Sequence, residues 1–61
     1  MSYQNVSLKY KPAIFSNKES ALRWAAFSPK FNRVVMADVG DWLVVCNADA
    51  MRLVRAGYEL V

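Results

Sequence analysis

Two valine-rich segments that flank a glycine constrain this chain more than any other feature. Residues 33–38 read Arg-Val-Val-Met-Ala-Asp and residues 42–46 read Trp-Leu-Val-Val-Cys. β-branched side chains favour strands, and Gly40 followed by a polar residue suits a two-residue type II′ turn. The sequence therefore predicts an antiparallel hairpin in which Val35 pairs with Cys46.

The chain ahead of the hairpin predicts a strand and then a helix. Apolar and polar residues alternate over residues 3–10, which is typical of a half-buried strand. Ser16 and Glu19 have the spacing of a capping box. The helix they introduce is expected over residues 17–27, because Pro29 disfavours helical backbone at the residue before it.

The chain after the hairpin predicts a second helix and a short strand. The helix is expected over residues 48–56, with Asn47 as its cap and Asp49 as a solvated charge in its first turn. Gly57 fits the left-handed position that follows a helix. Residues 58–61 then alternate as a short terminal strand would.

These elements predict one small α+β domain spanning residues 1–61. The order β-α-β-β-α, with a possible short C-terminal strand, is the split βαβ order of a ferredoxin-like plait. We expect two layers, an antiparallel sheet built around the central hairpin with both helices on one face.

The hairpin is apolar on both of its faces, and two short helices on one side would leave the other uncovered. Exposed apolar faces usually mark interfaces. We therefore expect a second copy or a protein partner on the free face, and which subset faces out depends on the register. The predicted contact residues are Trp42, Val44, Val35 and Met36. In the alternative, residues 3–15 fold over that face instead.

The length of the chain supports the expectation of a partner. Domains near 60 residues bury too little surface to be more than marginally stable, and small chains are usually stabilised by disulfides, metals or oligomerisation. Cys46 is the only cysteine and the chain has no histidine, so we expect no intrachain disulfide, no metal, no cofactor, no small-molecule substrate and no enzymatic activity. The remaining way to stabilise a chain of this size is a homodimer or a complex with another protein.

Basic residues favour an alternative function. Eight Lys and Arg against five Asp and Glu give a net charge of +3. Basic side chains near aromatic ones are typical of nucleic-acid surfaces, although a net charge of this size is ordinary and a solvated surface is the simpler explanation. The residues of this alternative are Arg23, Lys30, Arg33, Arg52 and Arg55.

The sequence alone thus predicts a non-enzymatic interaction or regulatory module, with a small nucleic-acid-binding protein as the alternative. The longest uninterrupted apolar run is the five residues 42–46, which is far too short to span a membrane. Together with a single free thiol, this run predicts a cytoplasmic protein that makes no membrane contact.

Overall fold

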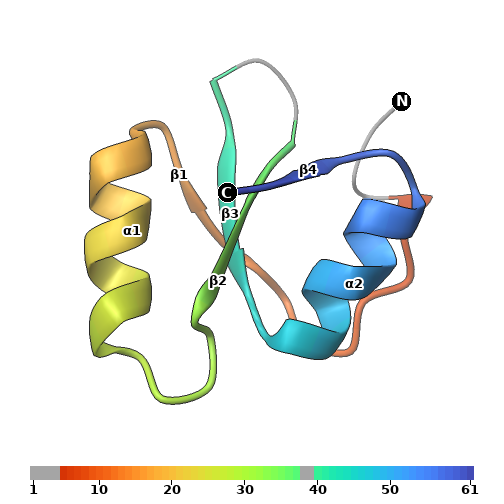
Figure 1. Ribbon diagram of the computed structural model, residues 1–61, viewed down its shortest axis with the longest axis horizontal. Coiled ribbons are helices and arrows are strands. Elements are labelled where there is room, and N and C mark those ends of the chain that lie inside the picture. The colour runs from red at the N-terminus through yellow and green to blue at the C-terminus, as the bar shows by residue number, and fades with distance from the viewer. Residues whose placement is uncertain (1–4, 38–39) are drawn as a thin grey trace.

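The computed structural model describes residues 5–37 and 40–61, which form a four-stranded antiparallel sheet with two helices (Figure 1). Along the chain the elements are β1 (Ala13–Phe15), α1 (Lys18–Phe27), β2 (Arg33–Met36), β3 (Trp42–Val45), α2 (Asn47–Arg55) and β4 (Glu59–Leu60). The predicted α+β class, the order of the elements and the closing strand are confirmed. In space the strands follow the order β1-β3-β2-β4, so the hairpin of β2 and β3 is central.

The two central strands are buried on both faces, and each face forms a separate apolar cluster with one helix. The cluster on the α1 side consists of Ala21, Ala25, Val34 and Val44. The cluster on the α2 side consists of Val35, Leu43, Val45, Ala50 and Leu53. The sheet is therefore the middle layer of the molecule.

This arrangement corrects the predicted two-layer domain with both helices on one face, because α1 and α2 lie on opposite faces (Figure 1). The reason is topological. α1 connects β1 to β2 across β3, and α2 connects β3 to β4 across β2, so both crossovers run in the same direction over the sheet. Because β1 and β3 are antiparallel, two crossovers of the same hand place their helices on opposite faces.

The first predicted strand is wrong where the structure describes it. Residues 5–10 form no strand, residues 1–4 lie outside the described residues, and β1 begins later. The alternation has another cause, since Val6 and Leu8 pack against the α2-side cluster. The backbone N–H groups that follow Leu8 donate to the Asp49 carboxylate instead of to a strand. This segment contributes to covering a sheet face, in the manner of the alternative prediction.

The hairpin is confirmed, but its predicted register is wrong. Val35 pairs with Leu43 instead of with Cys46. β2 ends at Met36, so the connection is longer than the predicted two-residue turn, and residues 38–39 lie outside the described residues. Because β2 and β3 are apolar on both faces, either register places apolar side chains on each side, and the alternation does not select one.

Local signals fix the start of α1 and the end of α2. Asn17, and not the predicted Ser16, caps α1, and its side chain accepts a hydrogen bond from the backbone N–H three residues later. The predicted Asn47 cap of α2 is wrong, because Asn47 is the first helical residue, Cys46 holds the cap position, and the Asn47 side chain accepts from Arg33 instead. α2 ends at Arg55, and Gly57, whose φ is +104°, takes the predicted left-handed position after it. The N–H of Tyr58 donates to the carbonyl of Leu53 at 3.1 Å, which closes a Schellman motif.

Leu53→Ala tests the α2-side cluster. Leu53 is fully buried, so we expect a loss of about 3 kcal/mol in the free energy of unfolding, measured by urea denaturation. Met51→Ala, at a half-exposed position of the same helix, is the matched control and is expected to cost less than about 1 kcal/mol. Equal losses in the two variants would contradict this packing.

Candidate functional site

The hairpin residues predicted as an interface do not form an open surface. Val35 and Val44 are fully buried, beneath α2 and α1 respectively. Trp42 is half-buried, and the Nζ of Lys18 lies 5.8 Å from the centre of its ring. Met36 exposes 36% of its surface. The predicted uncovered sheet face is therefore wrong for the described residues, because each face carries one helix.

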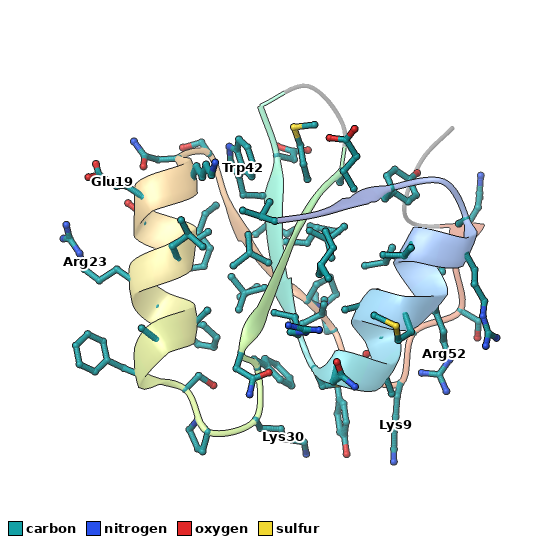
Figure 2. The ribbon with its side chains drawn as sticks, in the orientation of Figure 1. Lys9, Glu19, Arg23, Lys30, Trp42 and Arg52 are labelled. Carbon is teal, nitrogen blue, oxygen red and sulfur yellow. The ribbon has the colours of Figure 1, made fainter. Side chains whose placement is uncertain are left out.

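The five basic residues predicted for nucleic-acid binding are distributed over several elements. Arg23 projects from the side of α1 that faces away from the sheet (Figure 2). Lys30 lies in the connection between α1 and β2, and the Nε of Arg33 donates to the side chain of the first residue of α2 at 3.1 Å. Arg52 and Arg55 belong to α2. The structure thus separates Arg23 from the α2 arginines by the whole sheet.

α1 keeps most of its large apolar side chains out of the core. Its buried residues are Ala21 and Ala25. By contrast, Leu22 is 41% exposed, Trp24 is 42% exposed and Phe27 is 85% exposed. Alanines let the helix approach the sheet closely, and the larger side chains point sideways or outward. The helix therefore presents apolar surface to solvent.

An open groove of about 520 Å³ runs along this outer side of α1, and we refer to it as the α1 groove. It is lined by Phe15, Ser20, Arg23, Trp24, Phe27 and Ser28. The Trp24 ring lies 6.1 Å from that of Phe15 and 6.2 Å from that of Phe31, measured between ring centres. Tryptophan and arginine are enriched among the residues that carry binding energy at interfaces, so the α1 groove has the composition of a protein-binding surface.

Asp49 is fully buried, which corrects the prediction that it is a solvated charge in the first turn of the helix. Its Oδ1 accepts from the N–H of Lys9 at 2.9 Å and its Oδ2 accepts from the N–H of Tyr10 at 3.1 Å. The Nη1 of Arg52 lies 2.5 Å from the same Oδ1. An aspartate in a first helical turn is already explained by the helix dipole, so no local signal indicates partners some 40 residues away.

The contacts of Asp49 determine its charge state. Burial raises the pKa of this carboxyl, because a low-dielectric environment disfavours the charged form. Hydrogen bonds from the backbone of Lys9 and Tyr10 and from the Arg52 guanidinium act in the opposite direction and outweigh burial. The pKa of Asp49 therefore lies below its ordinary value of 3.8, and the carboxylate is ionised at neutral pH.

A second groove, of about 480 Å³, lies beside this carboxylate, and we refer to it as the basic groove. It is lined by Val6, Ser7, Leu8, Lys9, Arg52 and Arg55. Tyr10 lines a neighbouring pocket that shares Val6, Leu8 and Lys9 with the basic groove. The Nζ of Lys9 lies 5.6 Å and the Nζ of Lys30 3.7 Å from the centre of its ring. Hydrogen bonding by the Lys30 ammonium, and then the positive charges of Lys30 and Lys9, lower the pKa of the Tyr10 hydroxyl because they favour the phenolate.

The structure adds two findings on metals and membranes. Within residues 5–37 and 40–61, no three His, Cys, Asp or Glu side chains gather to hold a metal ion. The same residues include no helix whose length and apolar character would let it cross a membrane. Cys46 is half-buried immediately before α2.

Comparisons of the chain with protein-family models, with curated proteins and with solved structures found no match. The function is therefore inferred from the geometry of the chain's own residues.

Asp49→Asn tests the buried carboxylate. The amide removes the charge from three hydrogen bonds, so we expect the free energy of unfolding at pH 7 to fall by about 2 kcal/mol in urea denaturation. Glu59→Gln, at an exposed position, is the control and is expected to change stability by less than about 0.5 kcal/mol. An unchanged stability in Asp49→Asn would contradict this role.

The same carboxylate predicts a dependence of stability on pH. Because the pKa of Asp49 is lower in the folded than in the unfolded chain, its stabilisation is present above its ordinary value of 3.8 and is lost as the pH falls through the folded pKa. Urea denaturation between pH 7 and pH 2 should show a smaller acid-dependent loss in Asp49→Asn than in the unmodified chain. Parallel pH profiles for the two proteins would contradict the assignment.

Proposed function

We propose that the protein is a non-enzymatic interaction module that pairs with a second copy of itself through the outer face of α1. The observation that carries the proposal is the exposure of Phe27, whose ring is 85% exposed beside the partly exposed Trp24. Fully burying a phenylalanine side chain contributes about 2 kcal/mol. A partner that covers this ring and fills the α1 groove would recover that free energy in each subunit.

The charges on α1 favour a second copy as the occupant. Glu19, Arg23 and Phe27 follow one another at intervals of four residues, so they form a single stripe along the helix. Figure 2 shows Glu19 and Arg23 projecting from the side of α1 that faces away from the sheet. Two α1 helices packed antiparallel about a two-fold axis place each Glu19 opposite the partner's Arg23, and symmetry produces this pair twice.

The same antiparallel packing suits the apolar side chains. With Glu19 level with the partner's Arg23, each Phe27 approaches the beginning of the partner's α1. The α1 groove includes Phe15 at that end and Trp24 farther along the helix. Burial of the rings supplies most of the affinity, whereas exposed ion pairs contribute about 0.2–1 kcal/mol each and mainly fix orientation.

The proposal keeps the class of function expected from the sequence and moves it to a different surface. Val35 and Val44, which were expected at the interface, instead hold the helices on the sheet. A regulatory role and a cytoplasmic location belong to the same proposal. The single thiol of Cys46, which has no cysteine partner in the chain, is consistent with a reducing compartment.

Phe27→Ser tests the apolar part of the interface. Phe27 makes little contribution to the monomer's core because its ring is 85% exposed, so we expect folding to be preserved and self-association to weaken at least tenfold in a dilution series followed by light scattering. Met51→Ser, at a half-exposed position on α2, is the matched control and should associate normally. A monomer at all concentrations in the unmodified protein would refute the proposal.

A charge exchange tests the antiparallel arrangement. Arg23→Glu places two acidic side chains opposite each other, and we expect association to weaken about tenfold in sedimentation equilibrium. Adding Glu19→Arg reverses both charges and should restore association to near its original strength, since the pairing is between residues of different subunits. Failure of the double variant to recover would contradict the pairing of Glu19 with the partner's Arg23.

A further inference from the structure

The basic groove lies on the other side of the sheet from the α1 groove and has a different chemistry. Lys9, Arg52 and Arg55 line it together with the hydroxyl of Ser7. Figure 2 shows Lys9, Lys30 and Arg52 directed toward the same end of the molecule. The acid at this place is Asp49, which is fully buried beneath the cations. The groove therefore offers an outward surface of positive charge.

One buried carboxylate orders the groups that carry this charge. Asp49 holds the backbone N–H groups of Lys9 and Tyr10 and the guanidinium of Arg52. Because the backbone under Lys9 and Tyr10 is anchored, their side chains start from fixed positions. Groups ordered before binding lose less conformational entropy when a ligand arrives. Asp49 is thus a positioning residue for the basic groove.

An aromatic ring lies among these cations. The ring of Tyr10 has the Nζ of Lys30 at 3.7 Å and the Nζ of Lys9 at 5.6 Å from its centre. Its other neighbour is Phe31, whose ring centre is 5.8 Å away. Basic grooves that follow a phosphate backbone, combined with aromatic rings on which bases stack, are the means by which proteins bind single strands.

We propose that the basic groove, extended by Tyr10 and Lys30, binds the sugar–phosphate backbone of a single-stranded nucleic acid. Lys9, Arg52 and Arg55 contact phosphates along the groove, and Lys30 contacts a phosphate beside Tyr10. A concave groove with an aromatic ring at its end fits a single strand better than it fits the flat surface of an anionic membrane. This binding does not depend on the pairing of α1 helices.

The test is fluorescence anisotropy with a short labelled oligothymidine, repeated over a salt series. With four phosphates contacted, we expect a slope of log affinity against log salt of roughly −3 and an affinity about fiftyfold weaker at 200 mM than at 50 mM NaCl. No binding at 50 mM, or tighter binding to the matching duplex, would overturn the proposal. Binding to phosphatidylserine vesicles without binding to the oligonucleotide would overturn it too.

Substitutions locate the contacts. Lys9→Gln and Arg55→Gln should each make the salt slope shallower by roughly 0.7, because each removes one phosphate contact. Lys18→Gln is the matched control, because Lys18 belongs to α1, on the opposite side of the sheet, and lines neither groove; it should leave both affinity and slope unchanged. Equal effects of Lys18→Gln and Lys9→Gln would show attraction by net charge alone and would overturn the assignment of the groove.

The ring of Tyr10 is tested separately. Tyr10→Leu retains an apolar side chain but removes the stacking surface, so we expect about tenfold weaker binding with an unchanged salt slope. An unchanged affinity would overturn the role of the ring. Light scattering of the Lys9→Gln and Arg55→Gln variants should show self-association like that of the unmodified chain, which separates this proposal from the pairing of α1 helices.

Discussion

The burial of the central hairpin on both faces is the constraint on which the rest of the structure depends. Val34 and Val44 face one helix, while Val35 and Leu43 face the other. A strand pair that is apolar on both sides must be covered twice. With two helices available, one is placed on each face, and the outer sides of both helices remain exposed.

The two helices cover their faces in different ways. α2 contributes Leu53 and Ala50 to its cluster and is supported by Val6 and Leu8 from the segment before β1. α1 contributes alanines alone among its buried residues, so its larger side chains remain outside. Close packing through small side chains thus leaves an aromatic surface on α1, and this surface is the basis of the proposed pairing.

On the α2 side, the buried carboxylate of Asp49 likewise shapes the outer surface of the molecule. A carboxylate buried without partners would be strongly unfavourable, and Asp49 is stable in its position because it accepts two backbone hydrogen bonds and pairs with Arg52. These contacts hold residues 5–10 out of the sheet. They also fix Lys9 beside Arg52, so a single requirement for hydrogen bonding creates the basic groove.

Local patterns of apolar residues, caps and turns predict the hairpin, the two helices, the glycine after α2 and the short closing strand, but they place the first strand too early in the chain. The register of the hairpin and the side of each helix depend instead on contacts between elements. Alternation of apolar and polar residues cannot specify a register when both faces of the hairpin are apolar. The side of the sheet on which α2 lies depends on whether β4 pairs with β2, as it does here. The charge of Arg23 and Arg52 is enough to identify them as candidate binding residues. Their separation by the sheet, and the burial of Asp49, result from contacts between residues far apart in the chain. Local patterns carry no information on such contacts.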